Sequence, residues 1–284
     1  MDQDSTTNLN FYEYLSDFSF WIKAYTIALS LIGAIKLTQR QILLWNTRNL
    51  RKIWGVKDKE HVIVICSELD EPVKRQNVEP REFIYNLKYG DVDAYFEVIV
   101  TLLRLYPRLK LRILSSGEAK TTTFDLAQNL ILIGGPDYNE IALKIIDNHL
   151  TQIGYKSPYV REQSVINPNE IVIYHKDNDK EYCELDEMKD FGYFERINNP
   201  YDPRKKVILL GGCHTIGVTA AVKSFSLSLS EHGEIPGVVL SNSKKVAKKV
   251  KTNSEFAVIV KAERVGQSIN TPVVKDDLVF IRKE

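Results

Sequence analysis

The first 60 residues carry two apolar stretches, residues 18–35 and 41–45, with basic residues between and after them. The longer stretch contains one charged residue, Lys23. A membrane-spanning helix needs about 20 apolar residues, and the basic excess that follows favours a cytoplasmic C-terminal side. We predict that residues 8–54 are mostly helical and that Gly55 ends the last helix. Two interpretations stay open: residues 18–37 anchor the chain in the inner membrane, or the segment packs as a helical hairpin in a soluble bundle or oligomer.

From His61 onwards, short β-branched runs alternate with amphipathic stretches, which is typical of buried strands and crossover helices in a parallel sheet. The predicted strands are residues 62–66, 110–114, 130–133, 171–174, 206–210 and 256–260, with a more polar last strand over 273–281. The predicted helices are residues 92–106 with Asp91 as N-cap, a helix from Asn139 towards His149, and a helix after Gly217 that continues to about Ser230.

The predicted fold class is therefore α/β: a Rossmann-like, mostly parallel sheet flanked by helices and preceded by an N-terminal helical segment. Two parts are expected, an N-terminal helical or membrane-associated segment (1–60) and a nucleotide-binding domain (61–284). Within the second part, residues 154–203 are interpreted as a lid or insertion. Its acidic and aromatic stretch, residues 181–195, is expected to form an irregular hairpin or lid.

Composition narrows the classes of function. The formal net charge is +1 and the sequence pI is about 7.7, so the chain lacks the global basic field of a nucleic-acid-binding protein, and no specific nucleic acid is expected. Three cysteines without a CxxC pair and five scattered histidines give no zinc pattern, so we expect no metal site. The polar first residues do not resemble a secretory signal, and a reducing cytoplasmic compartment is expected for the domain.

Glycine turns that follow predicted strands are the main candidate sites. A glycine turn before a helix N-terminus exposes backbone N–H groups to an anion such as phosphate. The candidate ligand-binding residues come from three such turns: Gly134, Gly135, Asp137 and Asn139; Gly211, Gly212, His214, Thr215, Gly217 and Thr219; and Gly90 with Asp91. Arg81, Lys88 and Arg161 are nearby basic candidates. In the alternative interpretation the glycines only make tight turns, and Asp137 and Asn139 cap a helix.

No catalytic set is evident in the sequence. The turn at Gly211 is neither a Walker A loop nor a strict GxGxxG motif. Cys213 precedes a helix, where its thiolate would be favoured, although a small buried residue is the simpler role. The basic run over residues 244–251 is interpreted as a solvated helical face. The catalytic residues, if there are any, are therefore unknown at this stage.

The turns over Gly134–Asn139 and Gly211–Gly217 resemble those of Rossmann-like nucleotide-sensing domains of bacterial anti-phage and conflict systems. Such domains are often joined to short transmembrane or helical N-terminal effector segments. The resemblance covers about residues 61–284. It implies sensing of a nucleotide signal, such as a cyclic nucleotide or an NAD-derived molecule, with the N-terminal helices as the output.

Three hypotheses follow. In the first, the α/β domain binds a nucleotide-type ligand without a resident cofactor, and the N-terminal helices act by homo-oligomerisation or by perturbing membrane lipid. In the second, the chain is an anchored enzyme acting on a nucleotide, of N-glycosidase or transferase type, with Asp91 and Asp137 as working groups. In the third, it is a scaffold without a small ligand. Turnover of the ligand would separate the second hypothesis from the first.

Overall fold

The computed structural model describes residues 6–68, 91–147, 150–157, 170–184, 186–227, 236–251, 254–266 and 268–282, with side chains from Phe20 onwards. The chain divides into two compact units, Met1–Arg48 and Asn49–Glu284. The boundary lies before the predicted one at residue 60, because the short helix α2 (Arg48–Trp54) packs into the core of the second unit through Leu50, Ile53 and Trp54.

The first unit is one continuous helix, α1 (Thr6–Asn46), which is long and apolar enough between Phe20 and Asn46 to cross a membrane. The predicted helical segment is thus confirmed, but the two apolar stretches share one helix and do not form a hairpin. The hydroxyls of Thr26, Ser30 and Thr38 donate to backbone carbonyls one turn earlier. Their polar groups are therefore satisfied within the helix, as an apolar surrounding requires.

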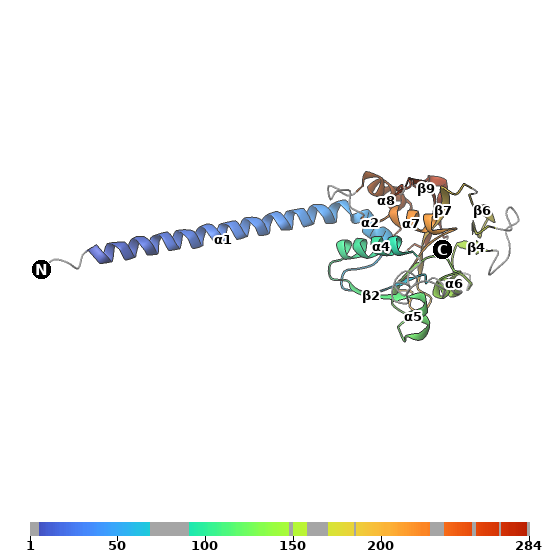
Figure 1. The fold of residues 1–284 in the computed structure, drawn as a ribbon, viewed down its shortest axis with the longest axis horizontal. Helices are drawn as coiled ribbons and strands as arrows, with labels where there is room; N and C mark the ends of the chain where they lie inside the picture. The colour runs from blue at the N-terminus through green and yellow to red at the C-terminus, as the bar shows by residue number, and fades with distance from the viewer. Residues whose placement is uncertain are drawn as a thin grey trace, which may run out of the picture. The chain divides into compact units, whose positions relative to one another are not determined.

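The second unit is an α/β domain, and the predicted fold class is confirmed (Figure 1). Its main sheet has the strand order β10-β9-β7-β8-β3-β1-β2, with β11 also paired to β9. The strands β2, β1, β3 and β8 run parallel, whereas β7, β9, β10 and β11 pair antiparallel. The bounds are β1 His61–Cys66, β2 Lys110–Ser115, β3 Asn129–Ile133, β7 Lys189–Asn198, β8 Lys206–Gly212, β9 Phe256–Val265, β10 Ser268–Ile269 and β11 Val279–Ile281.

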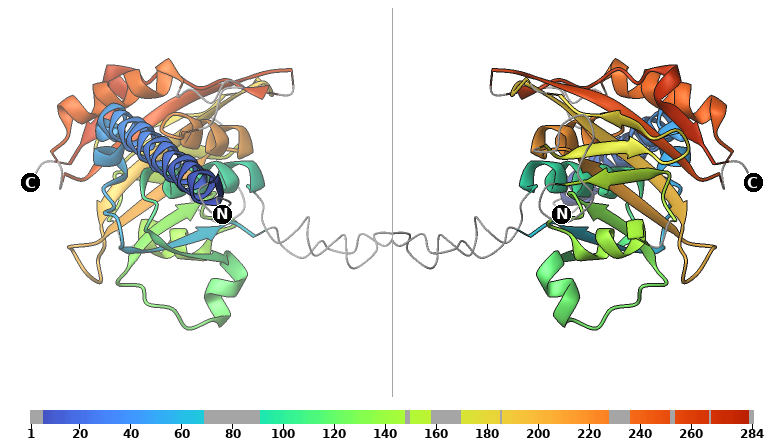
Figure 2. Two further views of the ribbon diagram at one scale, coloured as in Figure 1. Left: turned by 90° about the vertical axis from the view of Figure 1, so that its left-hand side faces the viewer. Right: turned by 90° about the vertical axis from the view of Figure 1, so that its right-hand side faces the viewer.

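Helices cover both faces of this sheet (Figure 2). One face packs against α2, α4 (Val92–Leu105), α7 (Thr215–Lys223) and α8 (Gly237–Lys249). The other packs against α5 (Ser116–Thr121), α6 (Glu140–Asp147) and a separate antiparallel sheet, β4 (Ile153–Lys156), β5 (Val172–His175) and β6 (Lys180–Tyr182). The β-branched runs of the sequence are buried on both faces, as a parallel sheet requires.

Several sequence expectations need correction. Residues 181–195 do not form one hairpin or lid, because β7 is an interior strand of the main sheet, paired with both β8 and β9. Acidic and aromatic residues obscured this strand in the sequence. The helix α7 ends at Lys223, and only Val279–Ile281 of the predicted last strand pairs with β9, after a short 3-10 turn (η1, Asp276–Leu278).

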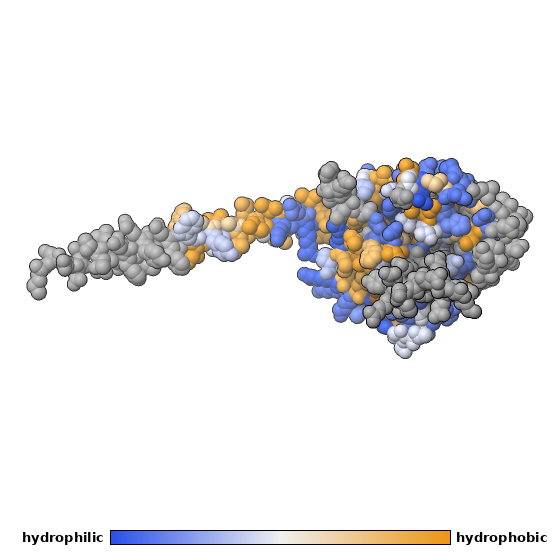
Figure 3. Space-filling view, in the orientation of Figure 1, coloured by the Kyte–Doolittle hydropathy of each residue, from blue (hydrophilic) through white to orange (hydrophobic). Residues whose placement is uncertain are grey.

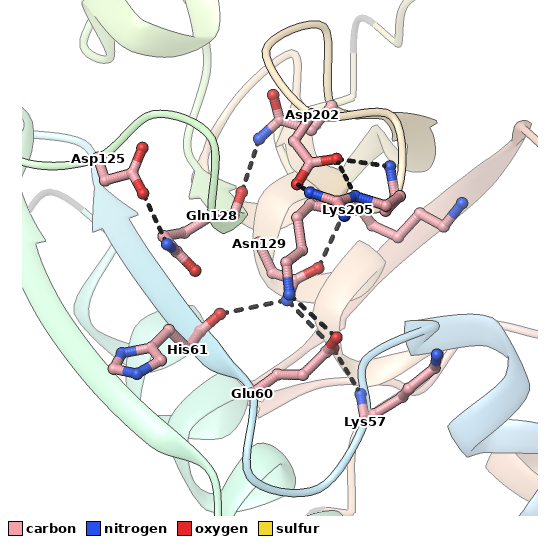
Figure 4. A network of polar contacts seen from close by, with 11 residues as sticks. Lys57, Glu60, His61, Asp125, Gln128, Asn129, Asp202 and Lys205 are labelled. Atoms are coloured by element: carbon pink, nitrogen blue, oxygen red, sulfur yellow. Dashed lines mark hydrogen bonds and ion pairs between the residues drawn. The ribbon is translucent and has the colours of Figure 1, made fainter.

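Polar residues fasten the amino ends of the parallel strands (Figure 4). The Glu60 carboxylate accepts hydrogen bonds from Asn129 at 3.2 Å, Lys205 at 3.1 Å and the backbone N–H of Lys57 at 3.0 Å. Burial raises the pKa of Glu60, but these donors outweigh it and hold the pKa below its ordinary value. This network fills the amino-terminal edge of the parallel strands with paired polar groups. The glycine turns lie at the carboxyl-terminal edge, where we therefore expect a ligand site.

Candidate functional site

A pocket of about 250 Å³ opens at the carboxyl ends of β1, β3 and β8. Three predicted turns reach it: the one after β3 through Gly135, the one after β8 through Gly212, His214 and Thr215, and Asp91 before α4. The other lining residues are Ser67, Tyr138, Tyr155, Ile171, Cys213 and Val218. The structure therefore brings together turns that are far apart in the sequence.

The position of the pocket follows from the order of the strands. β1 is followed in the chain by β2 on one side, and β3 then lies on the other side of β1. The helices after β1 and β3, α4 and α6, cover opposite faces of the sheet. Where connections diverge in this way, the carboxyl ends of the strands leave a crevice, and ligands of open α/β sheets bind there.

Asp91 and Ser67 form the buried polar base of the pocket. Asp91 is 7% exposed, and its Oδ2 accepts a hydrogen bond from Ser67 Oγ at 2.5 Å. Burial raises the pKa of Asp91, while hydrogen bonds from Ser67 and Thr215 oppose that shift without cancelling it. The sequence predicted Asp91 as the N-cap of α4, and it stands at that position, but its side chain caps no helix N–H. It instead faces Ser67 and the pocket.

Gly134 makes the close turn after β3. Its φ of +97° is in a region that favours glycine, and a Cβ there would lie 2.5 Å from Ser67 Cβ and 2.7 Å from Asp91 Oδ2. The backbone N–H of Gly134 donates to Leu210 O at 2.9 Å, which ties the turn to β8. The glycine therefore makes room for the Ser67–Asp91 pair, and it does not line the pocket itself.

Asn139 and Asp137 stabilise the turn after β3, which forms one wall of the pocket. Asn139 is fully buried: its amide donates to Ile65 O and Ile133 O, and its Oδ1 accepts from the N–H of Ala142, so it caps α6, as the alternative interpretation of this turn expected. These bonds leave it no contact with the pocket. Asp137 Oδ2 accepts hydrogen bonds from the hydroxyls of Tyr155 and Ser157, both at 3.0 Å. Asp137 therefore positions Tyr155, which lines the pocket.

The N-terminus of α7 already holds an anion, the carboxylate of Asp190 from β7. Asp190 Oδ2 accepts hydrogen bonds from the backbone N–H groups of Gly217 at 2.6 Å and His214 at 2.9 Å. Burial raises the pKa of Asp190 to about 6, although these donors lower it. Two of the N–H groups expected to bind phosphate are thus occupied. Those of Thr215 and Ile216 donate to no acceptor among the described residues.

Glycines let α7 approach the sheet closely. A Cβ on Gly212 would lie 2.6 Å from the backbone nitrogen of Val218, and one on Gly217 would collide with the backbone of Phe191. A Cβ on Gly211 would collide with the Tyr193 ring. The sequence indicated that Gly212 and Gly217 let a ligand approach. Both glycines permit the close approach of helix to strand, and of these three glycines only Gly212 lines the pocket.

The rim on the α7 side is exposed, whereas Cys213 is not. His214 and Thr215 are exposed, and His214 Nε2 lies 3.7 Å from Glu170 Oε2. Cys213 is 4% exposed and burial raises the pKa of its thiol, so the thiol stays protonated and the small buried role fits it. Thr219 is buried within α7 and does not line the pocket.

Some site residues could not be found from the sequence, and some predictions remain untested. Ser67, Tyr138 and Tyr155 line the pocket, and Asp190 supports it, but none belongs to a recognisable motif. The only available signal was Ser67, directly after a predicted strand. Gly90, Arg81, Lys88 and Arg161 lie outside the described residues. Among the described residues, no group of three His, Cys, Asp or Glu side chains is placed to hold a metal ion.

Comparison with known proteins finds no family model, no curated protein and no solved structure that matches the chain.

Proposed function

We propose that the Asn49–Glu284 unit binds a nucleotide-type ligand in the pocket and acts as a sensor, in bacterial defence, whose output is the N-terminal helix. The observation that carries this proposal is a buried carboxylate, Asp91, at the base of a pocket at the switch point of a parallel sheet. A pocket with a few convergent polar groups at such a point is the usual place for a small ligand.

The chemistry of the lining favours the ribose end of a nucleotide at the base. No lysine or arginine is among the described lining residues, and Asp91 would repel a phosphate. Sugar hydroxyls are suitable donors to Asp91, and the rings of Tyr138 and Tyr155 offer a surface for a base. In this proposal the phosphate lies at the rim and binds the N–H groups of Thr215 and Ile216.

Size limits the ligand further. Typical ligand pockets measure roughly 300–1,000 Å³, and the value of about 250 Å³ lies just below that range. The pocket therefore fits one nucleoside unit, and the remainder of a larger nucleotide would extend beyond the rim.

The route to the output runs along α7. Its first turn lines the pocket through Thr215 and Val218, and after its last turn the carbonyl of Phe225 accepts a hydrogen bond at 2.9 Å from Trp54 Nε1 in α2. Because α2 follows α1 in the chain, a ligand that moves α7 would act on the helix that leads to the apolar segment. Assembly into a homo-oligomer through α1, or perturbation of membrane lipid, is the proposed consequence.

An enzyme is the second candidate, and one observation favours it. A carboxyl group whose pKa is raised, hydrogen-bonded to a serine hydroxyl in a pocket, is a typical general acid or base. In this alternative, Asp91 would act on the ribose or the glycosidic bond of the bound nucleotide.

The test is a thermal-shift screen on the full chain in detergent, with NAD, ADP-ribose and cyclic nucleotides, followed by analysis of the ligand in the same wells. Saturating ligand should raise the melting temperature, because binding to the native state stabilises it by mass action. Asp91→Asn should abolish the shift. The matched control is Asp93→Asn, which makes the same change on an exposed residue of the same helix and should keep the shift.

Each outcome decides between the hypotheses. A shift that needs Asp91, with the ligand intact afterwards, supports the sensor. Consumption of the ligand by wild type and not by Asp91→Asn supports the enzyme. If no nucleotide raises the melting temperature, or if the rise is equal in Asp91→Asn and Asp93→Asn, the pocket is rejected as a nucleotide site.

A further inference from the structure

The helix α4 is apolar on two faces, and the fold buries only one of them. Its inner face contributes Ala94, Tyr95, Val98, Leu102 and Leu105 to the core. Asp93, Glu97 and Arg104 form a narrow polar side of the helix. The remaining apolar side is wider than the part that the core covers, and its outer part is exposed.

The exposed face is a continuous stripe. Val92, Phe96, Val100 and Leu103 are 38%, 59%, 41% and 47% exposed, and their spacing of four, four and three residues places them on one side of the helix. Leu111 and Ile113 of the neighbouring edge strand β2 are also only partly buried. Apolar side chains gather over α4 in Figure 3. Contiguous apolar surface of this kind marks an interaction site.

Basic residues surround the C-terminal end of the stripe. The loop before β1 lies against the turn between α4 and β2, because Arg108 N–H donates to Asp58 Oδ1 at 2.8 Å and Lys110 N–H donates to Glu60 O at 2.9 Å. This arrangement brings four cationic side chains to that end: Lys57, Lys59, Arg104 and Arg108. Lys110 and Arg112 alternate on β2 with Leu111 and Ile113, so they share the other face of the sheet with Leu114. The acidic residues are Asp58, Glu60, which is paired with Lys205, and Asp93 and Glu97 on the polar side of α4.

The C-terminal end of α4 lies beside the point at which the chain enters this unit. Tyr106, directly after α4, donates its hydroxyl to Arg51 O in α2 at 3.1 Å, and the Arg51 guanidinium lies 5.1 Å from the Tyr106 ring centroid. α2 begins at the end of the Met1–Arg48 unit, whose helix is long and apolar enough to cross a membrane. The connection along the chain between that helix and α2 is what motivates a lipid surface as the occupant of the α4 face.

We propose that the α4 face, defined as Val92, Phe96, Val100 and Leu103 with Arg104 and Arg108, lies on an anionic lipid surface. Apolar side chains enter the boundary between headgroups and acyl chains, and basic side chains bind anionic headgroups. This inference rests on the membrane anchoring contained in the proposed function.

The contact would place the pocket close to the membrane. Asp91 directly precedes α4, so the helix that lies on the lipid begins at the residue that forms the base of the pocket. Lipid binding to α4 and ligand binding to Asp91 would then act on the same helix.

The test uses the full chain reconstituted in vesicles of phosphatidylcholine, with or without phosphatidylglycerol. In a Cys183→Ser background, Phe96→Cys carries an environment-sensitive fluorophore, and lipids with a quencher near the headgroup report contact. Cys66 and Cys213 are buried and do not compete for the label. The matched control is Val265→Cys, which is 58% exposed at the end of β9, near the edge of the main sheet opposite to β2.

We expect quenching at position 96 to exceed quenching at position 265 several-fold in anionic vesicles. It should decrease in neutral vesicles and in the double variant Arg104→Gln, Arg108→Gln. Equal quenching at both positions, in protein that floats with the vesicles, would overturn the α4 contact and leave the anchor intact. Protein that does not float would overturn both. If the fluorophore at position 96 is shielded from water but not quenched by lipid, and copies of the chain crosslink there, the occupant of the α4 face is a second copy of the chain and not lipid.

Discussion

Asp190 Oδ2 accepts a hydrogen bond from the backbone N–H of Gly217 at 2.6 Å, so a carboxylate from β7 occupies the N-terminus of α7. The sequence had predicted that this helix N-terminus binds a phosphate. Asp190 also accepts the N–H of His214. An internal carboxylate and a ligand phosphate cannot both use these two donors. An anion could therefore bind only at the rim of the pocket, to the remaining N–H groups at the start of α7. The carboxylate of Asp91 at the base of the pocket favours ligand groups that donate hydrogen bonds, such as hydroxyls.

Removing the Asp190 carboxylate should destabilise α7. Asp190→Ala leaves the N–H groups of His214 and Gly217 at the start of α7 without this acceptor, and losses of this kind cost about 1–3 kcal/mol. Asp190→Asn keeps an acceptor oxygen and should cost clearly less. Urea unfolding followed by circular dichroism measures both changes. Equal losses in the two variants would show that charge, and not hydrogen bonding, is what α7 requires.

Gly134 should be far less tolerant of substitution than its neighbour Gly135. Gly134→Ala places a side chain at φ +97° and drives its Cβ towards Ser67 and Asp91, whereas a Cβ on Gly135 meets Tyr155 Oη at 3.2 Å. The unfavourable conformation alone costs about 1–2 kcal/mol, and the contacts add to it. Melting temperatures of the two variants provide the comparison. A Gly135→Ala variant as unstable as Gly134→Ala would refute the role of the turn.

The buried β-branched runs made the fold predictable in outline. Val62 to Cys66, Leu130 to Ile133 and Val207 to Leu210 each form a strand of the parallel part of the sheet, and each is followed by a turn that reaches the same edge. That convergence follows from the parallel arrangement itself, since the carboxyl ends of such strands share an edge. In these three strands the apolar sequence pattern therefore predicts both the strand and its place in the buried part of the sheet.

The details of the site depended on contacts between distant segments. Asp190 and Gly217 are hydrogen-bonded although 27 positions separate them in the sequence, and 24 positions separate Ser67 from Asp91. No local sequence pattern predicts contacts over such separations. β7 escaped prediction because Asp190, Glu195 and Arg196 are polar residues that the fold buries with partners, against the usual alternation. The packing role of Gly212 and Gly217 could not be predicted either, because it depends on the position of α7 against the sheet.

The hydrogen bond between Trp54 and Phe225 should contribute measurably to the stability of the second unit. Trp54→Phe removes the indole N–H and leaves the carbonyl of Phe225 without that donor in a buried position, at a cost of about 1–3 kcal/mol. The control is Trp45→Phe in α1, where the side chain is 68% exposed, and its unfolding midpoint should match wild type. If Trp54→Phe also matched wild type, the proposed route from α7 to α2 would lose its support.

The stability of the domain should fall as the pH rises through the range in which Glu195 titrates. Glu195 is fully buried and accepts hydrogen bonds from the backbone N–H groups of Gln152 and Ile153. Burial raises the pKa of Glu195 from 4.5 to about 8, outweighing these donors. The native state then holds a proton that the unfolded chain has released, so the free energy of unfolding decreases between about pH 4.5 and pH 8.

Glu195→Gln isolates this effect. Asp190, whose pKa is about 6, contributes the same sign at lower pH, so the window from about pH 6 to pH 8 reports mainly Glu195. There the wild-type slope should approach, and not exceed, about 1.4 kcal/mol per pH unit, and Glu195→Gln should flatten it because glutamine does not titrate. Glu263→Gln, on an exposed residue of β9, should keep the wild-type slope. Urea unfolding at a series of pH values measures all three. An unchanged slope in Glu195→Gln would mean that the native carboxyl group is already ionised below pH 6, held by its two backbone donors, and that burial is not the dominant influence on this residue.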